Sequence, residues 1–372
     1  MASTCNELLD LCLRGESWSP ELLDRAIAED DGRALMSIVV ERLGDLFEPD
    51  LCTVYANLFT EVITRVCPEL ISRTRRAPSS KLPEFAERVY VLSRITLGAD
   101  VAVTSVLLDA AKRRYPSAEV IFAGPRKNYE LFEADPRIAQ REITYARGGS
   151  LRDRLNASAA LWFDDGVVID PDSRLTQLGL IRVCPDDRYC LFESRSFGSS
   201  GNDRLPDLAA RWADDLEARP YIAPRSAEGP PSDITVSLGV GENSAKRVSD
   251  VFELQLLRML VETGASVLVD KGGSAEERER VERVIPPGVR THEGAFAPFA
   301  AEIARSKLFV GYDSAAGHVA SACGVPLISI AAGFVSERMA ARWRPLGSVI
   351  NGHGSRVIDQ IRRALATYTF RR

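Results

Sequence analysis

The feature that most constrains the fold of this chain is an alternation of short apolar strands with helices, which runs through it twice. The first series opens with a strand over residues 88–95 ("RVYVLSRI") and a helix over 99–116, and the second opens with a strand over 233–240. Strands that alternate with helices of this length form parallel sheets with helices on both faces. The sequence therefore predicts an α/β fold with two Rossmann-like domains facing a cleft.

Two further segments complete this predicted organisation. Residues 219–233, "RPYIAPRSAEGPPSD", are rich in Pro, Ser and Gly, as is typical of a linker between domains. The chain before the first strand has helical apolar spacing, and in "SPELLDRAIA" Ser19 is the expected N-cap with Pro20 in the first turn. We predict an α-helical N-terminal extension over 1–84, a first Rossmann-like domain over 85–225 and a second over 226–372.

Composition excludes several classes of function. The net charge of −5 and the lack of a basic stripe argue against nucleic-acid binding. No apolar run is long and uninterrupted enough for a membrane span, and "MASTCNELLD" lacks the charge and apolar core of a signal peptide. The seven cysteines include no C-x-x-C pair, so we expect reduced thiols, no metal site and a cytoplasmic protein.

The segment "VGYDSAAGHVASACGVP", residues 310–326, is the strongest candidate for a binding site. A buried strand is expected to end at Asp313 and Ser314, where a helix begins whose first N–H groups lack partners and carry partial positive charge. Small residues at the head of this helix leave room for a phosphate group: they are Ala315, Ala316 and Gly317. Two simpler interpretations stay open, since Ser314 can be a plain helix cap and the ring of His318 can face the core.

A second candidate lies in "SLGVGENSAKRVSD", residues 237–250. Here a strand ends at Gly239, and Ser244 and Lys246 precede a helix. A flexible backbone with exposed N–H groups and a fixed cation suits a diphosphate, although the spacing is not that of a Walker loop. The alternative is a solvated charged loop.

The third candidate is Asp100 in "RITLGADVAVTS", where the first strand becomes a helix. Its carboxylate either complements the start of the helix or faces the cleft as a general base that takes a proton from an acceptor hydroxyl. The acidic run "IDPD" at 169–172 is interpreted as a turn, because a proline separates its carboxylates.

Together and in this order, the three segments resemble glycosyltransferase family 9, the family of the lipopolysaccharide heptosyltransferases, which has the GT-B fold. "ADVAVT" is similar to the family's opening Gly-Asp segment, and Lys246 in "GENSAKR" to the lysine after its interdomain linker. "VGYDSAAGHVASACGVP" is similar to the family's V-G-x-D-[ST]-x-x-x-H motif with its following Gly-x-Pro. The resemblance covers roughly residues 88–350.

The resemblance implies an inverting, metal-independent glycosyltransferase with a hexosyl- or heptosyltransferase-like activity. Its second domain would bind a nucleotide-diphosphate sugar, and its first domain an acceptor hydroxyl or other nucleophile on an unknown glycan, lipid or protein. No cofactor is implied beyond this donor substrate. The diphosphate would lie against Asp313, Ser314 and the N–H groups of residues 315–317, with His318 and Lys246 nearby and Asp100 as the base.

The sequence departs from the family pattern at four places. Ala99 stands at the family's Gly and Tyr312 at its Asn, Ala315-Ala316 replaces Gly-Pro, and Val248-Ser249 replaces an aromatic residue followed by Pro. These departures bear on which nucleotide and which sugar would bind.

Other functions stay open. One is a non-catalytic GT-B-like protein that binds a sugar nucleotide or a partner, and another is a sugar-nucleotide epimerase or hydrolase. A Rossmann oxidoreductase is not expected, since no G-x-G-x-x-G follows the first strand. The helical extension lies outside the resemblance, so it either docks a partner, an acceptor protein or a second subunit, or packs without chemistry of its own.

Overall fold

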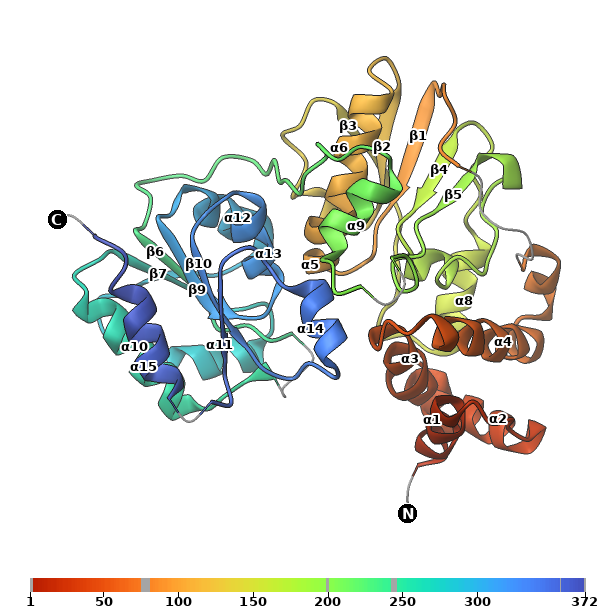
Figure 1. Ribbon diagram of the computed structural model, residues 1–372, viewed down its shortest axis with the longest axis horizontal. Helices are drawn as coiled ribbons and strands as arrows, with labels where there is room; N and C mark the ends of the chain where they lie inside the picture. Colours follow the sequence, from red (N-terminus) through yellow and green to blue (C-terminus); the bar gives the residue numbers. More distant parts are fainter. Residues whose placement is uncertain (1–2, 75–80, 199–200, 242–245, 355, 371–372) are drawn as a thin grey trace.

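The computed structural model describes residues 3–74, 81–198, 201–241, 246–354 and 356–370. It has two parallel sheets, each flanked by helices, and a helical region that precedes the first sheet and lies beside it (Figure 1). The predicted architecture of two Rossmann-like α/β domains after a helical extension is confirmed. The predicted domain boundaries themselves stay a prediction.

The first sheet has the strand order β3-β2-β1-β4-β5, and all its neighbouring strands are parallel. Its strands are β1 (Arg88–Leu92), β2 (Glu119–Gly124), β3 (Ile138–Glu142), β4 (Val167–Asp170) and β5 (Tyr189–Leu191). The helices of this part are α5 (Leu97–Ala99), η4 (Asp100–Thr104), α6 (Ser105–Arg114), α7 (Arg126–Tyr129), α8 (Leu151–Ala159), η5 (Arg174–Thr176), η6 (Asp186–Arg188) and α9 (Leu205–Trp212).

The second sheet has the order β11-β10-β9-β6-β7-β8 and is also parallel throughout. Its strands are β6 (Ile234–Ser237), β7 (Val267–Asp270), β8 (Arg290–His292), β9 (Leu308–Tyr312), β10 (Leu327–Ala331) and β11 (Ser348–Asn351). Its helices are α10 (Asp250–Glu262), α11 (Ala275–Glu282), α12 (Phe296–Arg305), α13 (Ala315–Ala322), α14 (Glu337–Trp343) and α15 (Val357–Leu365). The strand order reverses between β6 and β9, and ligands of such sheets bind outside the strand ends at this reversal.

The helical region before β1 has its own apolar core and is anchored on the first domain. It contains α1 (Thr4–Arg14), α2 (Pro20–Ala28), η1 (Glu29–Gly32), η2 (Leu35–Val40), α3 (Glu41–Asp45), α4 (Pro49–Val66) and η3 (Pro68–Arg73). Ser19 caps α2 by accepting a hydrogen bond from the N–H of Leu22 (3.2 Å), as predicted. Leu151 and Leu155 of α8 belong to the same apolar cluster, which joins this region to the first domain.

Three strands escaped the sequence analysis, and all three lie at sheet edges. They are β3, β8 and β11, with the sequences IAQRE, RTH and SVIN. An edge strand has a neighbouring strand on one side only and is more exposed to solvent. It therefore carries polar residues in place of the apolar run of a central strand. The apolar pattern that identified the central strands is therefore weak in these segments.

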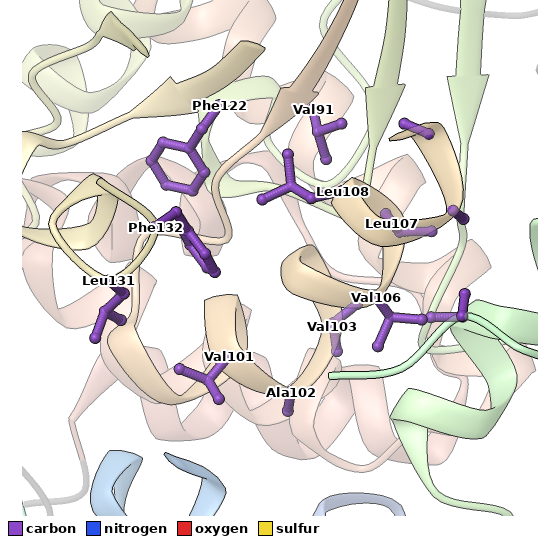
Figure 2. Packing of buried hydrophobic residues seen from close by; sticks show 14 of the residues in the cluster. Val91, Val101, Ala102, Val103, Val106, Leu107, Leu108, Phe122, Leu131 and Phe132 are labelled. Atoms are coloured by element: carbon purple, nitrogen blue, oxygen red, sulfur yellow. The ribbon is translucent and has the colours of Figure 1, made fainter. Parts of the chain in front are cut away.

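The main apolar cluster continues across the junction between the two domains. In the first domain it includes Val101 and Leu108, of which Leu108 lies beside Val91 of β1, and Phe122 lies beside Phe132 with ring centroids 5.5 Å apart (Figure 2). Val319 of α13, in the second domain, belongs to the same cluster. The two domains are therefore packed directly against each other through α13. No helix in the described ranges is both long and apolar enough to cross a membrane.

A glycine allows the two strands at the reversal to lie side by side. Gly311 of β9 pairs with Ser237 of β6, and a Cβ atom on Gly311 would lie 2.3 Å from the carbonyl oxygen of Ser237. We expect Gly311→Ala to lower the free energy of unfolding by roughly 1–3 kcal/mol, the usual cost of overpacking. Gly317→Ala is the control, because its Cβ would meet no atom closer than 3.8 Å. Chemical denaturation of both variants tests this, and equal losses would contradict it.

Candidate functional site

The reversal point of the second sheet brings together two of the segments singled out in the sequence. The ammonium of Lys246 donates a hydrogen bond to the carboxylate of Asp313 (2.7 Å) and a second to the carbonyl oxygen of Asp313 (3.2 Å). The two side chains are 20% and 8% exposed, respectively. A largely desolvated ion pair thus lies at the head of α13, where the first N–H groups of the helix lack intrahelical partners.

Ser314 precedes α13 in an extended conformation but does not cap the helix with its side chain. Its hydroxyl oxygen is buried and has no hydrogen-bond partner. The interpretation of Ser314 as a plain helix cap is therefore wrong. A buried hydroxyl without a partner is costly in a folded protein, so its presence beside the Lys246–Asp313 pair marks a place where a ligand oxygen can bind.

A buried network holds Lys246 in position. The hydroxyl of Tyr312 accepts a hydrogen bond from the N–H of Val248 (3.2 Å) and donates one to the fully buried carboxylate of Glu253 (3.0 Å). Arg247 pairs with the same carboxylate at 2.8 Å, and Arg280 at 2.7 Å. Arg247 is thus committed to structure, while Lys246 next to it is free to bond Asp313. Tyr312, one of the departures from the family pattern, fixes this loop.

A cavity of about 260 Å³ opens beside Asp313, between the ends of β10 and β11 and helix α14. Its lining is mostly apolar and comprises Asp313, Ser329, Ala331, Phe334, Ala340, Ala341, Arg344, Pro345 and Val349. The ammonium of Lys246 lies 5.9 Å from the centre of the Phe334 ring. Phe334, Arg344 and the α14 residues were not found by sequence analysis, because nothing in the local pattern of this segment indicates a pocket.

His318 lies at the junction between the two domains. Its half-buried ring packs edge-on against Trp343 at 5.7 Å, and a Cβ on Gly98 of the first domain would lie 3.2 Å from it. Burial lowers the pKa of His318, and the positive charge of Lys246 lowers it further, while the carboxylate of Asp313 acts in the opposite direction. Because the net effect is a lowered pKa, the imidazole is neutral at pH 7. The ring lines a void of about 10 Å³, roughly the space of one water molecule.

The loops after β6 and β7 are joined by one glutamate. The carboxylate of Glu277 accepts hydrogen bonds from the N–H groups of Gly273 (3.1 Å) and Val240 (3.3 Å), and a Cβ on Gly239 would lie 3.0 Å from it. Ser274, which precedes α11, in turn accepts a hydrogen bond from the N–H of Glu277 (3.1 Å). Gly239 therefore borders Glu277, while Ser244 lies outside the described residues.

Asp100 does not face an opening, contrary to the expectation of a carboxylate exposed to the cleft. It is fully buried, and its two oxygens accept hydrogen bonds from four donors: the hydroxyls of Ser93 and Thr104 and the amide of Asn128, all at 2.6 Å, and the N–H of Arg94 at 2.7 Å. Burial raises the pKa of Asp100 and these donors oppose the rise. Next to Asp100, α5 of the same domain abuts α13 of the second domain, where a Cβ on Gly98 would lie 3.3 Å from the Cα of Ala315.

The departure at Ala99 coincides with a local change of helix type. The turn that begins at Asp100 is a π-helix, η4, between α5 and α6. A π-turn takes up one residue more than an α-turn and often occurs at functional sites.

Within the described part of the chain, no three His, Cys, Asp or Glu side chains lie close enough together to hold a metal ion. Residues 251–355, which include β9 and α13, match the model of glycosyltransferase family 9 (heptosyltransferase). The predicted resemblance to glycosyltransferase family 9 is confirmed.

Solved structures of this family share the fold. The Escherichia coli heptosyltransferase WaaC with ADP-2-deoxy-2-fluoro heptose superposes with a TM-score of 0.55 at 14% identity, covering 75% of this chain and 99% of that one. The E. coli ADP-heptose LPS heptosyltransferase II gives 0.53 at 17% identity, covering 75% and 98%. A family 9 glycosyl transferase from Veillonella parvula gives 0.52 at 16% identity, covering 77% and 93%. No curated protein matches the sequence.

The solved structures confirm the GT-B fold of two Rossmann-like domains. The match of residues 251–355 to the family model indicates a glycosyltransferase. The superposed structures are covered almost to their full length, while about a quarter of this chain has no counterpart in them. The roles of individual residues stay predictions.

Asp270, at the end of β7, is a further ionisable group near these loops that the sequence did not indicate. Burial raises the pKa of Asp270 to about 6, and the main effect that opposes this rise is the charge interaction with His292. The folded state therefore binds this proton more tightly than the unfolded chain, and the stability contributed by the protonated form is lost as the pH rises from about 4 to about 6.

We expect Asp270→Asn to raise the free energy of unfolding at pH 7 by roughly 1–2 kcal/mol and to change it little at pH 4, since the amide removes the cost of a buried charge. Denaturant unfolding at the two pH values measures this. Asp359→Asn on the exposed face of α15 is the matched control and should be neutral at both. A gain of the same size at pH 4 and pH 7 would contradict the assignment.

Proposed function

We propose that the protein is an inverting, metal-independent glycosyltransferase that moves a hexosyl or heptosyl group from a nucleotide-diphosphate sugar to an acceptor hydroxyl or other nucleophile. The observation that carries this proposal is the Lys246–Asp313 pair beside the unpartnered hydroxyl of Ser314 at the head of α13. These groups lie at the reversal of strand order, where parallel α/β sheets bind their ligands.

The diphosphate is proposed to bind at the start of α13. The N–H groups of Ala315, Ala316 and Gly317, the hydroxyl of Ser314 and the ammonium of Lys246 supply donors there. Such preorganised donors stabilise the charge that develops on a leaving diphosphate without a metal ion or a further cofactor. The carboxylate of Asp313 repels the diphosphate unless a cation neutralises it, so its main role is to hold Lys246 in place.

The cavity beside Asp313 is proposed to receive the part of the donor next to the diphosphate. Its apolar walls and the ring of Phe334 suit a flat or weakly polar group, and Arg344 supplies one charged group at the wall. The E. coli relatives were solved with ADP and with ADP-2-deoxy-2-fluoro heptose, which supports a nucleotide-diphosphate sugar as the donor class.

Asp100 is proposed as the base, acting after α13 has moved away from α5. In the present arrangement its four hydrogen bonds leave no position for an acceptor hydroxyl. Separation of the two domains would open the end of β1, and closure over the bound substrates would then exclude water, as in other enzymes with moving domains. Burial raises the pKa of Asp100, so closure over the bound substrates would favour proton uptake by its carboxylate.

The saturated carboxylate of Asp100 also favours a second candidate function. In a non-catalytic GT-B-like protein that binds a sugar nucleotide or a partner, the same hydrogen bonds would simply hold the turn after β1 together. The residue would then be structural, and nucleotide binding at α13 would remain.

The proposed partners and location follow from the same features. The acceptor is an unidentified glycan, lipid or protein that reaches the first domain. The seven cysteines include no C-x-x-C pair, which suits the proposed cytoplasmic location because thiols stay reduced there.

Nucleotide binding tests the donor site directly. We expect one of UDP, GDP, ADP or dTDP to bind with micromolar affinity in calorimetric titration. Asp313→Ala should weaken this binding by roughly tenfold to a hundredfold, the equivalent of a charge-assisted hydrogen bond of about 1.5–3 kcal/mol, because Lys246 loses the partner that orients it. Asp359→Ala removes an exposed carboxylate of α15 and serves as the control. A folded protein that binds none of the four would contradict the proposal.

Turnover separates the two candidate functions. With the sugar donor of the nucleotide identified above, we expect Asp100→Asn to slow release of the nucleoside diphosphate by roughly 10²–10⁴-fold while nucleotide affinity is retained, since a general base contributes about this much. Thermal unfolding of the variant establishes that the fold survives. Turnover by Asp100→Asn at the rate of the unchanged protein would show that Asp100 is not the base, and no turnover by either protein would favour the non-catalytic function.

A further inference from the structure

The side chain of Trp343 lies where the three parts of the molecule meet. It is the last residue of α14, in the second domain. Its ring packs edge-on against His318 of the same domain at 5.7 Å, and the guanidinium of Arg94, in the first domain, lies 5.7 Å from the ring centre. Phe47 of the helical region packs edge-on against it at 6.4 Å.

The helical region reaches Trp343 through the turn between α3 and α4, which lies close to α14 (Figure 1). Phe47 in this turn is 1% exposed, and the guanidinium of Arg342 lies 6.0 Å from its ring. The next residue, Glu48, pairs with Arg338 of α14 at 3.1 Å. Two successive residues of the helical region therefore hold two turns of α14.

The same helix forms part of the donor cavity. Ala340 and Ala341 of α14 line the cavity beside Asp313, while Trp343 at the end of the helix contacts His318. A shift of α14 would therefore change the cavity wall and the position of the His318 ring together.

On the other side of Trp343, the contact with Arg94 leads to the proposed base. The Arg94 guanidinium donates hydrogen bonds to the carbonyl oxygen of Pro171 and the hydroxyl of Ser194, both at 2.6 Å, and its backbone N–H donates to Asp100 at 2.7 Å. Arg94 is thus fixed within the first domain. Its contact with Trp343 sets how the second domain lies against the turn that contains Asp100.

We propose that Trp343 is a positioning residue of the transfer reaction, and that the N-terminal helical region holds it in place through Phe47. The inference rests on the proposed function, because the groups that Trp343 positions are His318 beside the diphosphate site and Arg94 beside the proposed base. It gives the helical region a role within the chain, which is to complete the support of the donor site.

The position of Trp343 can be followed through His318 without any substrate. The chain has only three histidines, so NMR titration resolves them and His318→Gln identifies the signal. Asp313 and Lys246 are the charged groups that act on His318, and burial lowers its pKa. Trp343→Ala should let water reach the ring and raise the pKa of His318 toward its ordinary value, while Trp343→Phe should restore most of the effect.

Phe47→Leu tests the helical region, because it keeps an apolar side chain and removes the ring that meets Trp343. We expect the pKa of His318 to rise and the Kd of the bound nucleotide diphosphate to increase by roughly threefold to tenfold, the size of a lost aromatic contact. Phe85→Leu is the matched control, since Phe85 is 72% exposed and is expected to change neither quantity. Thermal unfolding of each variant shows that it is folded at the temperature of the titration.

The outcomes separate the inference from the proposed function. If the unchanged protein binds a nucleotide but Phe47→Leu leaves both the His318 titration and the Kd as they were, the inference is wrong and the proposed function stands. If the unchanged protein binds none of UDP, GDP, ADP and dTDP, the proposed function is wrong and the inference falls with it. The inference would also be overturned if Trp343→Ala raises the pKa of His318 and Trp343→Phe raises it equally.

Discussion

Helix α13 has to fit against two neighbours at once, and this constraint determines much of the structure around it. Its inner face packs on the second sheet, and its first turn abuts α5 of the other domain, where a side chain on Gly98 would meet Ala315. Only small residues satisfy both contacts, which explains the run of alanine and glycine at its start. Lys246 and the cavity lie beside Asp313 at the N-terminus of α13, so the first N–H groups of the helix begin next to the proposed donor site.

The charges behind this site are costly to bury, and each has a partner that compensates the cost. Glu253 is fully buried and is matched by Arg247 and Arg280, and Asp313 is matched by Lys246. A buried pair of this kind adds little net stability over an apolar pair of the same size. Its effect is instead to fix geometry: removing one partner would leave the other charge uncompensated, so the loop that carries Lys246 has one favourable position.

The closed junction between the domains explains the contrast between the donor site and the proposed base. The donor groups are gathered within one domain and need no partner domain to come together. The four donors that hydrogen-bond to Asp100 all belong to the first domain, so these bonds do not depend on the second domain. The second domain packs against the turn after β1, where Gly98 meets Ala315 of α13, and the helical region contacts α14 from outside through Phe47 and Glu48.

The sequence by itself determined the strand–helix alternation, hence the two parallel sheets, because central strands and amphipathic helices carry local apolar patterns. It also placed Lys246 and Asp313 at strand ends, and parallel strands bring their carboxyl ends to one edge. It did not reveal the edge strands, whose polar residues give no such pattern, or Phe334 and the α14 residues of the cavity. Only the tertiary structure decided that Asp100 is covered and that Trp343 meets Phe47, His318 and Arg94. Those contacts join residues far apart in the chain, and they follow from how the folded units dock rather than from any local preference.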